Sequence, residues 1–334
     1  MQTTILKIFL LFVAVSLSLV GCDQVSEQIS YQIAEQKVRS INLALIPSER
    51  EEGLAFLPFT DTYLEKRHEI YNRLSADSLN ENQQSELNYL KIQERYPERY
   101  LPWPAHVNVL HNALMQQASE QQIKQWMTQV IARLDKAKQS KIYLSRIELS
   151  LLKSYLTDVS MGETLQAYLE KYKPRSGIGL YQIPNGKEWY QSKLNFYYTQ
   201  AVAPNMLLNE VQEQLAKSRN KASSDIKLDI VEPFALSVLK QYCDNLIPGL
   251  NWIDKYVNLP GTYADCKPKL TNETKKVLLA LMEIDLGINY QGWSYKQASL
   301  TLGSRLHIAD KQVSALIENT VLYPGSILTF LAAI

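Results

Sequence analysis

The stretch SEQQIKQWMTQVIARL, residues 119–134, decides the class of fold. Its apolar residues recur at steps of three and four positions, which places them on one face of an α-helix. These residues are Ile123, Trp126, Met127, Val130, Ile131 and Leu134. Ser119 followed by Gln122 is a capping-box pattern, in which each side chain binds the backbone N–H of the other residue. The stretch therefore predicts an amphipathic helix that begins after Ser119.

Helical patterns continue on both sides of this stretch, and no run alternates between apolar and polar residues as a strand does. The predicted helices cover residues 63–74, 81–95, 142–156, 163–172, 189–198, 206–217 and 271–290, and a short apolar segment covers 233–242. Ser294 with Gln297 caps a further helix that Gly303 ends, and Asp310 opens another. The sequence predicts a mainly α, multi-helical body with few or no short strands.

The N-terminus has the layout of a bacterial lipoprotein signal peptide. Lys7 supplies a positive charge, an apolar run extends from Ile8 to Val20, and the sequence Leu-Val-Gly-Cys at 19–22 resembles a lipobox. As a helix the run would cover about 20 Å, short of the roughly 30 Å hydrocarbon core, which indicates a secretory signal rather than a membrane span. We expect cleavage after Gly21 and lipidation of Cys22. The alternative is an ordinary signal peptide with an accidental cysteine.

The predicted lipid fixes the expected location. Acyl chains on Cys22 would anchor the protein to a membrane of the cell envelope, with its body facing the periplasm. Asp23 resembles the inner-membrane retention signal of enteric bacteria and slightly favours the inner membrane. We predict four regions: a signal peptide at 1–21, a lipidated N-terminus and tether at 22–50, and helical regions at 51–175 and 176–334.

Charge and motifs exclude several classes of function. The chain has 35 Lys and Arg against 34 Asp and Glu, so it has no basic footprint for nucleic acid. The sequence contains neither a glycine-rich phosphate-binding loop nor the G-x-S-x-G turn of serine hydrolases. We therefore expect no nucleic acid as a partner, and contact with the membrane through the lipid.

Two cysteines follow Cys22, namely Cys243 and Cys266. In an oxidising compartment an even pair predicts a disulfide, which would stabilise the fold by on the order of 3 kcal/mol. The alternative is two separate buried thiols. Two thiols without nearby histidines make a poor zinc site.

Three stretches carry a resemblance to a known family. They read GLYQIPNGKEWY at 179–190, DLGINYQGWS at 285–294 with Gln297 and Ala298 beyond it, and YPGSILTF at 323–330. In this order they resemble segments of the bacterial domain-of-unknown-function family 885 (DUF 885). Its members are often secreted or lipid-anchored and look like zinc metallopeptidases. The chain stops earlier than the family does, so we expect a divergent, C-terminally shortened member.

The resemblance implies a metal motif that this chain does not keep. The family's motif resembles H-E-x-x-P-G-H-H, and the alignment centres on Pro233. Apolar or non-basic residues then stand at the metal-site positions, which are Asp229, Ile230, Ala235, Leu236 and Asn289. Ser326, Phe330 and Leu331 likewise replace a glutamine, a tyrosine and a lysine of the third stretch. The sequence therefore predicts no catalytic residue, no metal and no cofactor.

No other residue pattern restores such a site. The four histidines are His68, His106, His111 and His307. None of them forms the i, i+4 pair that presents two imidazoles together, since His106 and His111 lie about 140° apart around a helix. Four carboxylates could form a hard-cation or acid/base cluster, although surface carboxylates are the more common explanation. These are Asp229, Glu232, Glu283 and Asp285.

Three hypotheses about function remain open. The first is a lipid-anchored, non-catalytic envelope protein with a binding or structural role, for which the family resemblance implies a peptide or another envelope protein as partner. The second is an active peptidase or hydrolase with relocated catalytic residues, and the third is a decaying gene product with no selected function. The apolar segment 326–334 is either buried against the body, which we favour, or exposed as a partner surface.

Overall fold

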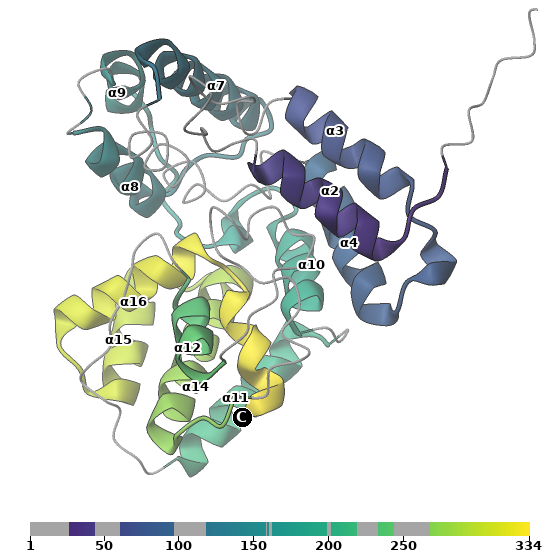
Figure 1. Cartoon of the computed structure of the whole chain (residues 1–334). Helices are drawn as coiled ribbons and strands as arrows, with labels where there is room; N and C mark the ends of the chain where they lie inside the picture. Colours follow the sequence, from purple (N-terminus) through teal and green to yellow (C-terminus); the bar gives the residue numbers. More distant parts are fainter. Residues whose placement is uncertain are drawn as a thin grey trace, which may run out of the picture.

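The computed structural model describes residues 27–43, 61–96, 118–157, 159, 162–198, 202–218, 233–243 and 268–334. Within these ranges the chain forms helices and no β-strand, and its extended pairing consists of two isolated bridges, Ile29 with Leu74 and Ser145 with Arg175. The helices form three groups, seen in Figure 1 as purple to blue, dark teal, and teal to yellow ribbons. The prediction of a mainly α body is confirmed.

The first group contains α2 (Tyr31–Leu43), α3 (Asp61–Asn72), the 3-10 turn η1 (Ala76–Ser78) and α4 (Glu81–Arg95). α3 packs against both α2 and α4. Asn80 caps α4 with Gln83. α4 has the predicted bounds, whereas α3 begins and ends two residues before the predicted helix. α2 lies within the segment 22–50, and the predicted division of the chain into four regions stays a prediction.

The second group contains α7 (Glu120–Gln139), α8 (Arg146–Leu156) and α9 (Glu163–Glu170). The capping box of Ser119 and Gln122 is present, and the predicted apolar face of α7 is buried at Ile123, Trp126, Met127, Val130 and Leu134. α8 begins four residues later than predicted because the Ser145 side chain accepts a hydrogen bond from the Glu148 backbone N–H and stops the helix there.

The third group forms the larger body. Its elements are η2 (Leu180–Gln182), α10 (Gly186–Tyr198), α11 (Pro204–Lys217), α12 (Phe234–Tyr242), α14 (Asn272–Leu286), η3 (Gly287–Gln291), α15 (Tyr295–Leu306), α16 (Asp310–Leu322) and η4 (Ser326–Ala333). α14 lies at the centre, because every residue from Val277 to Leu286 is buried. It packs against α11, α15, α16 and η4. A helix that is buried on all sides is the core of its domain.

Two further predicted helix ends differ from the structure for reasons that the packing explains. The helix predicted for 271–290 changes after Leu286 into the π-helix η3, where a side chain at Gly287 would overlap the Trp293 indole. Gly303 does not end α15, which continues to Leu306 and ends at His307 in the left-handed conformation, with φ 54°. Gly303 lies in the helix near Val313 of α16, where its surroundings leave room for a side chain.

The apolar C-terminal segment is buried, as we favoured. η4 is a 3-10 helix, and its residues Ile327, Leu328, Phe330 and Leu331 belong to the core. None of the described helices is alone long and apolar enough to cross a membrane; only α16 and η4 together pass that test, and they meet at a bend of 100°.

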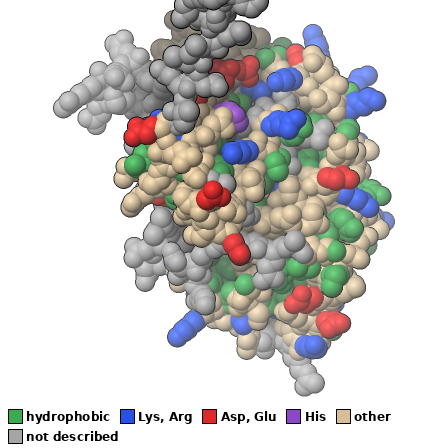
Figure 2. Space-filling view, turned by 90° about the vertical axis from the view of Figure 1, so that its right-hand side faces the viewer, with side chains coloured by type: hydrophobic (Ala, Val, Ile, Leu, Met, Phe, Trp, Pro, Cys, Tyr) green, Lys and Arg blue, Asp and Glu red, His purple; other side chains and the backbone are tan. Residues whose placement is uncertain are grey.

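The described surface carries both signs of charge. The face drawn in Figure 2 has Lys and Arg as well as Asp and Glu side chains, with hydrophobic side chains between them. This agrees with a formal net charge of +1 for the whole chain.

Candidate functional site

The stretches singled out in the sequence meet in the third group of helices. η2 packs against η3, and η4 packs against α10, α12 and α14. Two glycines of the first stretch make this packing close. A side chain at Gly179 would lie 2.1 Å from the Ile288 carbonyl oxygen, and one at Gly186 would lie 1.7 Å from the Leu180 carbonyl oxygen. These motif glycines are therefore required by backbone contact.

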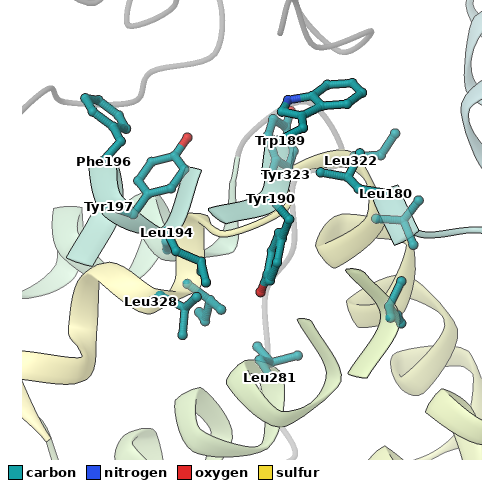
Figure 3. Packing of buried hydrophobic residues seen from close by; sticks show 14 of the residues in the cluster. Leu180, Trp189, Tyr190, Leu194, Phe196, Tyr197, Leu281, Leu322, Tyr323 and Leu328 are labelled. Carbon is teal, nitrogen blue, oxygen red and sulfur yellow. The ribbon is translucent and has the colours of Figure 1, made fainter. Parts of the chain in front are cut away.

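Asp285 of α14 lies where these segments meet, and it is fully buried. Its Oδ1 accepts a hydrogen bond from the Tyr190 hydroxyl of α10 and a longer one, of 3.4 Å, from the Asn289 amide of η3. Its Oδ2 accepts from the Gly325 backbone N–H, at 2.9 Å, just before η4. In Figure 3 the Tyr190 side chain points from α10 toward α14, on which Leu281 lies. One carboxyl group thus ties together four segments.

Lys193 follows Tyr190 by three residues on α10 and is also buried. Its ammonium group donates to the Tyr89 hydroxyl of α4 at 3.3 Å. The Tyr89 ring in turn stacks on Phe196, with ring centroids 4.2 Å apart. Lys193 therefore lies between the Asp285 cluster and the first group of helices.

Burial dominates the ionisation of this cluster. Burial raises the pKa of Asp285 to about 6, against the lowering effects of the bonds from Tyr190, Gly325 and Asn289 and of the Lys193 charge. Burial lowers the pKa of Lys193 to about 8, and the nearby Asp285 charge works against that decrease. Burial and the Asp285 charge hold the pKa of Tyr190 well above its usual value. The cluster thus holds an acid and a base whose pKa values lie near neutrality.

A small cavity borders the carboxyl group. Its volume is about 10 Å³, which is room for roughly one water molecule. Its polar lining is already hydrogen-bonded: Asn319 accepts from the Phe234 N–H, and the Thr320 and Ser326 hydroxyls donate to backbone carbonyls. A substrate of any ordinary size cannot enter this space.

The positions that the resemblance assigns to a metal do not carry metal ligands where the structure describes them. Ala235 lines the cavity beside Asp285, and Leu236 is buried in the same helix. Asn289 donates to Asp285, and its carbonyl oxygen accepts from the Leu180 N–H at 3.0 Å. Asp229 and Ile230 lie outside the described residues. Zinc takes thiolate, imidazole or carboxylate ligands, so Ala235, Leu236 and Asn289 do not fit it.

The other candidate groups do not gather around Asp285. Glu283 lies two residues before it on α14 but binds Arg305 of α15, at 2.8 and 2.9 Å, and Gln212 of α11, at 3.0 Å. His68 lies in α3 and His307 at the end of α15. His106, His111 and Glu232 lie outside the described residues. Within the described ranges, no three His, Cys, Asp or Glu side chains lie close enough to hold a metal ion.

The cysteines are described only in part. Cys243, at the C-terminal end of α12, is disulfide-bonded. Cys22 and Cys266 lie outside the described residues, so the pairing of Cys243 with Cys266 and the lipidation of Cys22 stay predictions.

Sequence reasoning missed Lys193 as a member of the cluster. The signal was present, because Lys193 lies on α10 between the apolar residues Tyr190, Leu194 and Tyr197. A lysine on the apolar face of a helix is either buried with partners or exposed by snorkelling, and only the packing of α4 decides between the two.

Comparison with known proteins adds no relative. No protein-family model matches the chain, and no curated protein and no solved structure matches it significantly.

Proposed function

We propose that this chain is a lipid-anchored envelope protein, a divergent relative of the domain-of-unknown-function family 885, with a binding or structural role and no catalytic one. The expected partners are the membrane, through the lipid on Cys22, and a peptide or another envelope protein. The observation that carries the non-catalytic part of the proposal is the set of contacts around Asp285.

A catalytic carboxyl group must reach the proton that it moves, directly or through one water. Asp285 is fully buried, and its two oxygens accept hydrogen bonds from Tyr190, Asn289 and Gly325. The adjoining cavity has room for about one water molecule. This geometry suits a carboxyl group that joins helices, and it supports a structural role for the cluster.

The aligned metal positions support the same proposal. The methyl group of Ala235 cannot ligate a metal, and the Asn289 amide is engaged by Asp285 and the Leu180 N–H. The bond from the Leu180 N–H to Asn289 holds η2 against η3, so a residue aligned with a family histidine has here a packing function.

The first test measures metal content and peptidase activity on two preparations. One is the mature protein in detergent, and the other is a soluble form that begins at Asp23. We expect less than stoichiometric zinc and no peptide hydrolysis from either. Stoichiometric zinc with hydrolysis that a chelator abolishes would overturn the proposal and support a hydrolase with relocated residues.

The second test addresses the anchor. Bacteria that express the full-length chain are grown with radiolabelled palmitate, beside bacteria that express Cys22→Ser. We expect label and membrane association for the original chain and neither for the variant. Cys243→Ser is the control that removes a cysteine from the body. Equal labelling of the original chain and Cys22→Ser would contradict the predicted lipidation.

A further inference from the structure

The turn that leads into η4 contacts two buried ionisable residues, Asp285 and Lys193. Gly325 adopts the left-handed conformation, with φ 84°, and donates its N–H to Asp285 Oδ2 at 2.9 Å. A side chain at Gly325 would lie 3.3 Å from the Lys193 Cβ and 3.2 Å from the Tyr197 ring. Leu194 of α10 and Leu328 of η4 lie near one another beyond this turn (Figure 3). Movement of η4 away from α10 and α14 would therefore bring water to Asp285 and Lys193.

The polar groups that face the Asp285 carboxyl come from α10, η3 and the turn before η4, whereas α11 and α15 face Glu283 on the same helix. α10 contributes the Tyr190 hydroxyl and the Lys193 charge, and η3 contributes the Asn289 amide. The turn after α16 contributes the Gly325 N–H. The remaining cavity lining from α12, α14, α16 and η4 comprises Phe234, Ala235, Leu281, Leu316, Asn319, Thr320, Tyr323, Ser326 and Ile327. Among the described residues in this set, the titratable groups are Asp285, Lys193, Tyr190 and Tyr323, and Tyr89 of α4 faces the Lys193 ammonium group.

We propose that Asp285 and Lys193 form a pH-sensitive latch on the C-terminal segment, which holds η4 more tightly against α10 and α14 in mild acid than at neutral pH. The latch consists of Asp285, Lys193, Tyr190 and the Gly325 N–H.

The direction of the pH dependence follows from the change in solvation of Asp285 and Lys193 when η4 separates. With η4 in place, burial raises the pKa of Asp285 from 3.8 to about 6. When η4 separates, water returns this pKa toward its ordinary value, so the attached state binds the proton more tightly. Protonation of Asp285 therefore favours attachment, and this contribution is lost as the pH rises through about 6.

Lys193 sets the alkaline limit of the pH range in which η4 is held least tightly. Burial lowers its pKa from 10.5 to about 8, so below pH 8 the charged ammonium favours the separated, solvated state. Between about pH 6 and pH 8 both groups are charged, and η4 is then held least tightly. Acidification below this window neutralises Asp285 and tightens the latch.

The test is hydrogen exchange of the full mature protein at pH 5, 6 and 7, with rates corrected for the intrinsic pH dependence of exchange. We expect the protection of the amides of Gly325 and η4 to be about tenfold higher at pH 5 than at pH 7, from the pKa values of 6 and 3.8. The amides of α7, in another group of helices, serve as the internal control. Equal protection of η4 at the three pH values, or a change that α7 shares, overturns the proposal.

Two variants make the assignment specific. Asp285→Asn cannot ionise, and we expect the protection of η4 to lose its pH dependence. Tyr190→Phe keeps the carboxyl group but removes a donor that favours its charged form, so we expect the midpoint of the change to move to higher pH. If Asp285→Asn does not fold, a pH titration of the carboxyl carbon-13 chemical shift of Asp285 in the original protein tests the proposal instead. A midpoint near 4 overturns the proposal, and one near 6 supports it.

Discussion

Tyr190 donates its hydroxyl hydrogen bond to the carboxylate of Asp285, which lies 95 residues further along the chain. The bond joins α10 to the central helix α14, and it lies among fully buried groups. It also lowers the pKa of Asp285 against the larger effect of burial. One tyrosine thus has a measurable effect both on stability and on the ionisation of the carboxyl group.

The first prediction concerns the loss of this donor. Tyr190→Phe should reduce the free energy of unfolding at pH 8 by about 2 kcal/mol, because a buried, charged acceptor loses its hydrogen bond. Denaturant unfolding measures the change. Tyr295→Phe is the control, since Tyr295 is partly exposed and its hydroxyl bonds to the surface residue Ser314. Equal effects of the two substitutions would contradict the importance of the buried bond.

The second prediction concerns the global pH dependence. The pKa of Asp285 is raised in the folded state, so its contribution to stability is fully present below its ordinary value and is lost as the pH rises through about 6. The difference in unfolding free energy between the original protein and Asp285→Asn should therefore fall by about 1 kcal/mol from pH 5 to pH 7. Chemical denaturation at both pH values measures it. A difference that rises over this range would show that the pKa of Asp285 is lowered by folding.

The third prediction concerns the packing of η4. Leu328→Ala should cost about 2–5 kcal/mol of stability, because Leu328 is completely buried and its segment η4 packs against both α10 and α14. Leu300→Ala, which truncates a leucine that is 65% exposed on α15, should change stability by less than about 0.5 kcal/mol. Thermal or denaturant unfolding of both variants tests the prediction. Similar effects of the two truncations would mean that η4 is not part of the core.

The fourth prediction uses two glycines with opposite surroundings. Gly179→Ala should cost more than about 3 kcal/mol, because the new methyl group would lie 2.1 Å from the Ile288 carbonyl oxygen and force η2 away from η3. Gly303→Ala should raise stability by about 0.5–1 kcal/mol, because Gly303 lies inside α15 and the new methyl group would lie 4.0 Å from the Val313 side chain, an ordinary contact distance. The sign of each change is read from unfolding midpoints, and a stabilised Gly179→Ala would contradict the close contact.

Local sequence was sufficient for most of the helices. The face and the start of α7 follow from the spacing of its apolar residues and from the pairing of Ser119 with Gln122. Helical periodicity failed where a contact beyond the regular i to i+4 pattern decides the outcome. The helix at 271–290 changes to a π-helix at Gly287, whose carbonyl accepts from the Trp293 N–H and whose position beneath the Trp293 ring excludes a side chain.

The candidate site could be anticipated only in outline. Three stretches were singled out, and the structure brings them together, because glycines allow η2 to contact η3. The burial of Lys193 was not foreseen, since it depends on α4, more than a hundred residues earlier in the chain. Nor did the spacing of Glu283 and Asp285 reveal that they face different neighbours, Arg305 in one case and Tyr190 in the other.

The central position of α14 also has a consequence for the order of folding. Every residue from Val277 to Leu286 is buried, and all but Glu283 and Asp285 are apolar, so an isolated α14 would expose mostly apolar surface to water. The segments that bury it include ones distant in sequence, such as α11 and α10, whose Tyr190 bonds to Asp285 across 95 residues. Such long-range closure is slow, and partly folded chains expose apolar helix surface until it is complete. Refolding from denaturant should therefore pass through an aggregation-prone species, one that disappears only when α10 and η4 have closed over α14.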